Sequence, residues 1–219
     1  MTDIFREVDE DVRRDKAIEF WKKYQSLLIG IALIIVLATA GWRAYQYWQV
    51  RMAQSASAHY EKALELARAG KGGEAQAELD RLVAKAPSGY RTLARLRLAA
   101  EAGKSDPVAG AKAFDALAAD ASIGSTFQEI ARLRAAMLLM DTADPRDIRN
   151  RLEPLAAAGG AFRHTARELL ALSALKVNDT EAAGRWLDMI EVDPETPADL
   201  RKRADALLGL VRGAKAATG

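Results

Sequence analysis

Histidines, cysteines and closely spaced acids are the residues with which this chain could bind a metal or transfer protons, and few are suitably placed. His59 and His164 are the only histidines, and neither has a second histidine or a carboxylate at metal-ligand spacing in the sequence. Cysteine is absent, which excludes disulfides, thiol catalysis and Cys-ligated metals. Among 30 acidic residues no pair stands out for acid–base work. The sequence therefore predicts no enzyme activity, no metal and no cofactor, and a surface or packing role for both histidines.

Glycines and basic residues give no sign of a nucleotide or nucleic-acid site. The glycines cluster only at Gly70, Gly72 and Gly73 and at Gly159 and Gly160, where they suit helix ends and do not match a phosphate-binding loop. The 32 basic and 30 acidic residues alternate in sign along the chain without a Lys/Arg block. We therefore expect no nucleic acid and no small-molecule substrate, which leaves membranes and proteins as the expected partners.

One uncharged run, Leu27 to Trp42, dominates the N-terminal part of the chain. As a helix this run measures roughly 24 Å, a little less than the hydrocarbon core of a bilayer. Aromatic residues on both sides extend it, as an interfacial belt would. The residues predicted to hold this helix in a membrane are Trp21, Tyr24, Leu27, Leu28, Ile31, Leu33, Ile34, Ile35, Leu37, Trp42 and Tyr45.

Basic residues set the predicted orientation of this membrane helix. Lys and Arg are frequent before the run, whereas only Arg43 and Arg51 occur in a comparable stretch after it, so the positive-inside rule places the N-terminus in the cytoplasm. The chain thus divides into a cytoplasmic amphipathic segment (1–25), a transmembrane helix (26–48) and a large domain on the other side (49–219). The amphipathic segment could lie along the membrane or act as a cytoplasmic docking signal.

Two other interpretations of the apolar run stay open. The first is a cleaved signal peptide, because Ala38-Thr39-Ala40 has the small-x-small form of a cleavage site. The second is a buried core helix, although such helices normally carry a polar stripe and Leu27 to Ala38 carries none. A membrane anchor explains the run best, since the leading segment is long and acidic and the aromatic belt continues past the cleavage site.

After the anchor, the pattern is helical throughout, and we expect an all-α fold without strands. Helix pairs start at intervals of roughly 35 residues, which is the period of tetratricopeptide-like helix-turn-helix repeats. The predicted starts of these pairs are Ser55, Gly89, Ser125, Ala161 and Thr196. A single transmembrane helix followed by a tetratricopeptide-like solenoid is therefore the predicted architecture, and a nonrepetitive helical bundle is the alternative.

Residue types within the repeats support the solenoid. Small residues let paired helices approach, large ones fill the space between pairs, and proline ends the second helix. Residues of these types in the first unit are Ala63, Leu66, Ala75, Leu79, Leu82 and Pro87, and in the fourth Leu170, Ala182, Trp186, Met189 and Pro194. Leu98, Phe114 and Leu117 keep the spacing in a middle unit.

Capping residues locate the helix starts more closely. Asp106-Pro107, Asp144-Pro145 and Thr196-Pro197 each place a capping residue before a proline, and Asn178 with Glu181 resembles a capping box. Pro154 should end its helix early.

The N-terminal segment carries a resemblance to a known family. The order Glu7-Val8-Asp9-Glu10-Asp11-Val12-Arg13-Arg14, then Trp21-Lys22-Lys23-Tyr24, then one membrane helix and an alanine-rich helical domain is similar to the YfgM-like ancillary SecYEG translocon subunits. The motif residues that carry this resemblance are Glu7, Val8, Asp9, Asp11, Arg13 and Arg14. Gln25 stands where many relatives have glycine.

The resemblance implies a bacterial inner-membrane protein with a cytoplasmic N-terminus and a periplasmic C-terminal domain. Such a protein would associate with the SecYEG translocon and with periplasmic folding factors, and would link protein export to chaperones. Two alternatives are an envelope assembly scaffold without a chaperone role and a soluble periplasmic adaptor released by signal cleavage. The sequence assigns no partner-binding residues.

Overall fold

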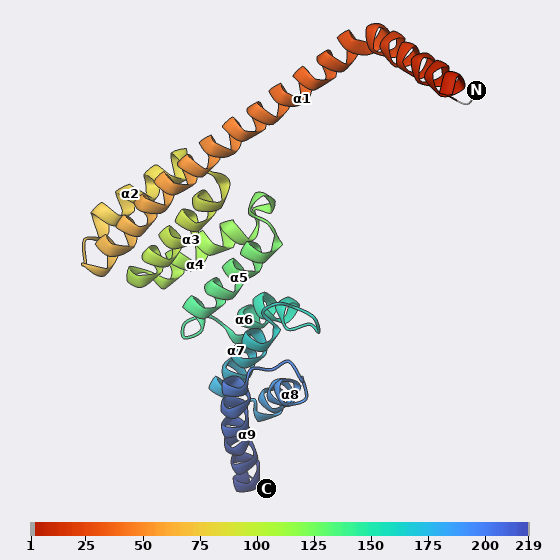
Figure 1. Cartoon of the computed structure of the whole chain (residues 1–219). Helices are drawn as coiled ribbons and strands as arrows, with labels where there is room; N and C mark the ends of the chain where they lie inside the picture. Colours follow the sequence, from red (N-terminus) through yellow and green to blue (C-terminus); the bar gives the residue numbers. More distant parts are fainter. Residues whose placement is uncertain (1–2, 219) are drawn as a thin grey trace. The chain divides into compact units, whose positions relative to one another are not determined.

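The computed structural model describes the backbone of residues 3–218 and the side chains of Arg14 and of residues 18–213. These described residues form α-helices and two short 3₁₀ helices and contain no strand, which confirms the predicted all-α fold (Figure 1). In chain order the elements are α1 Asp3–Arg68, α2 Gly72–Lys85, α3 Ser88–Ser105, α4 Pro107–Ala118, η1 Ala121–Ile123, α5 Ser125–Leu139, α6 Pro145–Leu152, η2 Glu153–Leu155, α7 Arg163–Lys176, α8 Thr180–Glu191 and α9 Ala198–Thr218.

The chain divides into two compact units, Met1–Gln54 and Ser55–Gly219, and helix α1 contributes to both. The prediction that a helix starts at Ser55 is wrong, because α1 continues through this residue to Arg68. The physical reason is local: no glycine or proline lies between Gly41 and Gly70, so nothing in the sequence ends the helix.

In the first unit, α1 exposes its apolar residues. Every residue from Leu27 to Trp42 is exposed, with Leu28 at 41% and Ile34 at 66%. The helix from Ile18 to Arg68 contains an 18-residue window of mean hydropathy 2.1, none of it buried, and is long and apolar enough to cross a membrane.

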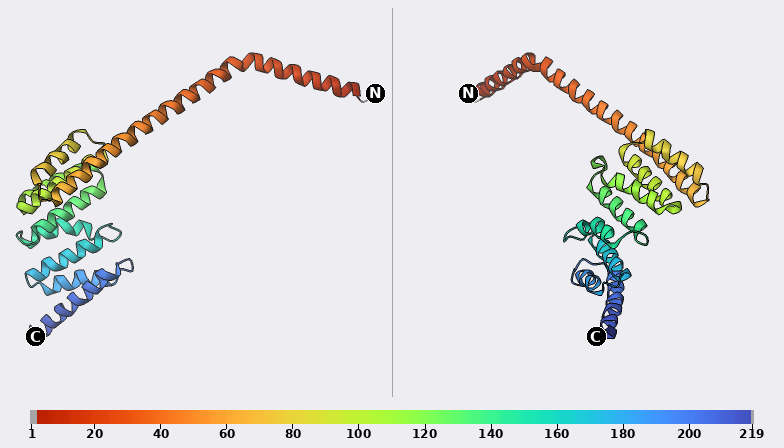
Figure 2. Two further views of the ribbon diagram at one scale, coloured as in Figure 1. Left: turned by 60° about the vertical axis from the view of Figure 1, so that its left-hand side comes forward. Right: turned by 180° about the vertical axis from the view of Figure 1, so that it is seen from behind.

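The second unit is a stack of consecutive helices. Each helix from α2 to α5 packs on its sequence neighbour, as do α6 with α7 and α8 with α9 (Figure 2). Helices α3, α5, α7 and α9 begin within two residues of the predicted starts Gly89, Ser125, Ala161 and Thr196. The repeat spacing is thus confirmed from the second helix pair onward.

The core of this unit is divided into four clusters, each shared by neighbouring helices. The first cluster contains Leu79, the second Phe114, the third Leu152 and the fourth Leu187. Alanines fill about half of the buried core positions and let the helix axes approach. Such a chain of local cores is typical of a solenoid, in which each repeat contacts only its neighbours.

Two predicted caps are confirmed and two are wrong. Asp106 and Asp144 accept backbone hydrogen bonds at the starts of α4 and α6. At α8 the cap is Asp179 rather than Asn178, because Asn178 adopts a left-handed backbone with φ of 59° and Asp179 accepts from Ala182 N. At α9, no backbone N–H of the described residues donates to the Thr196 hydroxyl, which instead donates to the carbonyl of Ile190 over 2.7 Å.

Helix α6 ends at Leu152, immediately before η2, which contains Pro154. The early end predicted from this proline is therefore confirmed. Trp186, predicted to pack in the core, is partly buried against two of the four clusters.

Candidate interaction groove

Both histidines contact carboxylates that the sequence spacing did not indicate. His59 Nδ1 lies 3.0 Å from Glu78 Oε2, and His164 Nδ1 lies 3.8 Å from Asp193 Oδ2. The absence of a carboxylate at metal-ligand spacing in the sequence did not indicate these contacts, because tertiary packing brings Glu78 of α2 and Asp193 of the loop after α8 to histidines on other helices. No group of three or more potential ligands that could hold a metal occurs among the described residues.

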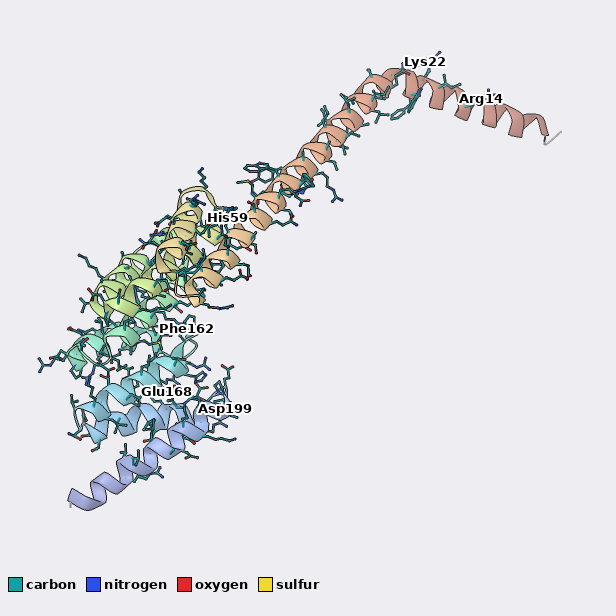
Figure 3. All side chains as sticks on the ribbon, turned by 90° about the vertical axis from the view of Figure 1, so that its left-hand side faces the viewer. Arg14, Lys22, His59, Phe162, Glu168 and Asp199 are labelled. Carbon is teal, nitrogen blue, oxygen red and sulfur yellow. The ribbon has the colours of Figure 1, made fainter. Side chains whose placement is uncertain are left out.

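The first of these contacts belongs to an ion-pair cluster between α1 and α2, and the position of His59 is labelled in Figure 3. Glu78 is buried, and its Oε1 accepts from Lys62 Nζ at 2.7 Å. The hydrogen bond from Lys62 lowers the pKa of the Glu78 carboxyl and outweighs the opposing effect of burial. Arg81 and His59 complete the set of partners. Because the chain itself satisfies this carboxylate, the cluster joins two helices rather than offering a binding site.

A second cluster fastens the loop between α8 and α9 to α7. Asp193 Oδ2 accepts from Arg163 Nε at 2.7 Å and from Arg167 Nη1 at 2.9 Å. The hydrogen bond from Arg163 holds the pKa of Asp193 far below its usual range. Burial and the charge of Arg163 lower the pKa of His164, so the neutral imidazole is favoured there. This cluster too is satisfied within the chain.

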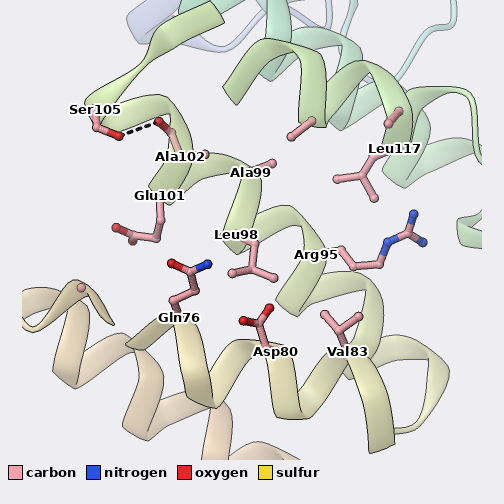
Figure 4. Close-up of a pocket in the computed structure, with 13 residues that line it drawn as sticks. Gln76, Asp80, Val83, Arg95, Leu98, Ala99, Glu101, Ala102, Ser105 and Leu117 are labelled. Carbon is pink, nitrogen blue, oxygen red and sulfur yellow. Dashed lines mark hydrogen bonds between the residues drawn. The ribbon is translucent and has the colours of Figure 1, made fainter. Parts of the chain in front are cut away.

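An open groove is formed by α2, α3 and α4 (Figure 4). Its volume is ≈ 620 Å³. Helix α3 packs against both α2 and α4 and therefore supplies the floor, while α2 and α4 supply the walls. The lining residues are Gly72, Gln76, Asp80, Val83, Arg95, Leu98, Ala99, Glu101, Ala102, Ser105, Ala113, Ala116 and Leu117.

The α4 wall of the groove is apolar and mostly small, whereas α2 and the α3 floor contribute both apolar and polar side chains. Arg95 forms an ion pair with Asp120, in which Arg95 Nη1 lies 2.7 Å from Asp120 Oδ2. Hydrogen bonds from Ser122 and then Arg95 lower the pKa of Asp120 to about 2. Asp80 makes no ion pair with any described residue.

Glu101, the other acid in the groove, is paired with cations of its own helix. Lys104 Nζ lies 2.7 Å from Glu101 Oε2, and Arg97 Nη2 lies 2.6 Å from Oε1. The Arg97 contact lacks hydrogen-bond geometry, so the buried Oε1 has no hydrogen-bond donor. Burial raises the pKa of Glu101, but hydrogen bonding to Lys104 and the charge of Arg97 outweigh it and the pKa is lowered.

Further along the solenoid the corresponding gaps are smaller. The gap lined by α4, α5 and α6 has a volume of ≈ 270 Å³, and an ion pair between Asp115 of α4 and Arg151 of α6 spans its walls. The gap beside Trp186, between α6 and α8, measures ≈ 290 Å³. The α2–α3–α4 groove is therefore the largest of the three.

The residues singled out in the sequence do not converge on this groove. The apolar and aromatic anchor residues lie on α1 in the first unit, and Leu98 and Leu117 alone among the predicted repeat residues line the groove. Of the acidic and arginine motif, Arg14 is exposed, and the side chains of Glu7, Val8, Asp9, Asp11 and Arg13 lie outside the described residues. No sequence signal indicated Asp80, because its place at a groove depends on how α2 and α4 flank α3.

A family model described as a tetratricopeptide repeat-like domain matches residues 18–187. Neither the comparison with curated proteins nor the comparison with solved structures gives a match.

Proposed function

Because the chain belongs to the tetratricopeptide repeat-like domain family, we propose that it is a membrane-anchored protein whose helical repeats bind other proteins. The observation that supports this most is the exposed apolar run from Leu27 to Trp42, which stands on the same unbroken helix as the first repeat residues. An exposed apolar helix of this length is stable in hydrocarbon, because its backbone groups are satisfied internally. Repeat domains of this kind are interaction scaffolds rather than enzymes.

The anchor would divide the chain into the segments 1–25, 26–48 and 49–219. The excess of Lys and Arg before the run favours a cytoplasmic N-terminus and a repeat domain on the other side of the membrane. The resemblance to the ancillary SecYEG subunits implies that this membrane is a bacterial inner membrane and that the repeat domain is periplasmic. Tethering raises the effective concentration of the repeats near partners in the same membrane, so weak contacts would suffice.

The partner proposed for this protein is the protein-export channel. The acidic and double-arginine motif before the anchor, together with the anchor and the helical repeats behind it, is similar to the ancillary SecYEG subunits named above. In this role the repeat domain would stand at the exit side of the channel and contact periplasmic folding factors or emerging chains.

Co-purification from membranes tests this function. Tagged full-length protein, extracted in mild detergent, should bring down channel subunits, and a fragment lacking residues 1–48 should lose most of them. A matched control replaces Leu27 to Trp42 by an unrelated membrane helix. We expect co-purification to persist with this control, because the repeat domain should make most of the specific contact.

Absence of channel subunits from the full-length sample would contradict the export role and favour an envelope scaffold. The anchor itself is tested separately by alkaline carbonate extraction, in which the protein should stay with the membranes. Recovery in the soluble fraction, with Gly41 as the first residue, would instead identify a cleaved signal peptide.

A further inference from the structure

The α2–α3–α4 groove has the length of a short helix. Its lining residues extend from Gly72 to Val83 on α2 and from Arg95 to Ser105 on α3. At 1.5 Å per residue, each stretch measures about 15 Å, which corresponds to about three helical turns. A segment of that length presents side chains at positions i, i+3, i+4 and i+7 to one surface.

The walls of the groove favour a helical occupant over an extended one. Helices α2, α3 and α4 use their own backbone groups internally and offer no strand edge. An extended peptide in the groove would leave its backbone amides and carbonyls without partners, at a cost for each buried group. A helix satisfies its own backbone and needs only side-chain contacts, which is how amphipathic helices bind in apolar grooves.

The small side chains of the groove permit close approach. Ala99 and Ala102 lie on the floor, and Ala113 and Ala116 on the α4 wall. Because the distance between packed helices is set by the side chains at the contact, alanines allow an incoming helix to sit low. Leu98, which is partly exposed, then provides apolar surface for its larger side chains.

The charged side chains of the groove determine which charge a bound helix should carry. Arg95 lines the groove and is paired with Asp120, and three further cations of α2 and α3 or of the residue before α2 are paired within the chain: Lys104 with Glu101, Arg81 with Glu78 and Lys71 with Glu74. The exposed carboxylate of Asp80 has no ion-pair partner among the described residues, whereas Glu101 is paired with Arg97 and Lys104. Among the charged residues that line the groove, Asp80 is therefore the one left without an opposite charge.

The neighbouring gap shows how such a carboxylate is otherwise matched. There Arg151 of α6 forms an ion pair with Asp115 of α4 across the gap. In the α2–α3–α4 groove, α4 contributes only Ala113, Ala116 and Leu117 to the lining and supplies no cation to Asp80.

We propose that the α2–α3–α4 groove docks one amphipathic helix of a partner protein, with its apolar face on α3 and one Lys or Arg paired with Asp80. The inference rests on the proposed function, because it assigns the partner-binding surface of the repeat domain. The ligand that this groove would recognise is a three-turn helix with small or aliphatic residues on one face and a cation at the edge of that face.

The test uses the full-length chain in lipid nanodiscs and a display library of 14-residue helices. The library varies the residues of one helical face and one flanking position, which is Lys, Glu or Ala. Two variants alter the groove: Asp80→Lys reverses its unmatched charge, and Ala116→Phe fills it from an exposed position. Asp188→Lys on α8 and Ala109→Phe on α4 are matched controls, since both residues are exposed and neither lines the groove.

Enriched helices should carry Lys at the flanking position and bind Asp80→Lys about tenfold more weakly than the natural chain, because attraction becomes repulsion. Replacing that Lys by Glu in the enriched helix should restore binding to Asp80→Lys. Binding should be lost in Ala116→Phe and remain within about twofold in both controls. Failure to enrich any helix, or equal binding by groove and control variants, would overturn the proposal.

The same variants separate this inference from the export role. If library helices bind the groove while no channel subunit co-purifies with the natural chain, the groove assignment stands and the export role fails. If channel subunits co-purify equally with all four variants and no helix is enriched, the export role stands and the groove assignment fails.

Discussion

The contact between Gly103 and Gly110 makes the groove geometry testable through stability. Helices α3 and α4 cross so closely that a Cβ on Gly110 would lie 2.4 Å from Gly103 Cα and 2.6 Å from Gly103 N. Leu138 Cδ1 of α5 lies 3.0 Å from the same position. The obstacle is mainly backbone, which cannot turn aside as a side chain can. Gly110→Ala should therefore force the floor and one wall of the groove apart.

The change in the free energy of unfolding caused by Gly110→Ala is the difference between two opposing effects. Alanine is favoured over glycine inside a helix by about 1 kcal/mol. Overpacking a close contact costs about 1–3 kcal/mol, and a backbone clash belongs at or above the upper end of that range. We expect Gly110→Ala to lower the free energy of unfolding by about 2 kcal/mol. In Gly103→Ala the new Cβ meets Leu138 Cδ1 at 2.7 Å, and this side chain can move in part, so the loss should be smaller.

Gly209→Ala is the matched control, because Gly209 lies within α9 and a Cβ there would meet nothing within 4 Å. It should stabilise the chain by about 0.5–1 kcal/mol. Thermal unfolding of the full-length protein in detergent, followed by far-UV circular dichroism, measures both effects. At about 2–4 °C per kcal/mol, Gly110→Ala should lower the Tm by about 4–8 °C and Gly209→Ala should raise it slightly. A Gly110→Ala protein that melts at or above the natural Tm would refute the close contact of α3 with α4.

Three further predictions concern the polar clusters and the anchor. Arg167→Leu removes a buried guanidinium that donates to two backbone carbonyls, and should cost about 3 kcal/mol in thermal unfolding, whereas Arg203→Leu, at an exposed ion pair, should change the Tm little. The pKa of Asp120 is lowered to about 2 in the folded chain from an ordinary 3.8, so its stabilising effect is complete above about pH 4 and is lost as the pH falls toward 2. Between about pH 4 and pH 2 the free energy of unfolding should therefore fall less in Asp120→Asn than in the natural chain. Identical pH dependence in the two proteins would contradict the lowered pKa of Asp120. Protease added to spheroplasts should remove the region after Trp48 and spare the first 20 residues; protection of the repeat domain would reverse the proposed topology.

The sequence by itself determined the features that depend on neighbours along the chain. Apolar periodicity and capping residues located α3, α5, α7 and α9 to within two residues, because helix formation and capping involve residues three or four positions apart. The early end of α6 before Pro154 followed from the same local rule. The helix start predicted at Ser55 is wrong, because the repeat period was extended to a place where no residue ends α1.

Only the tertiary structure decided which distant residues meet. His59 and Glu78 are separated by 19 positions and His164 and Asp193 by 29, and nothing in their spacing indicates contact. The same holds for the groove: Asp80 and Ala116 line one surface only because α2 and α4 both pack on α3. The angle and distance at which two helices pack depend on the fit of all side chains between them, such as the Gly103–Gly110 contact, and no local pattern of one helix encodes that fit.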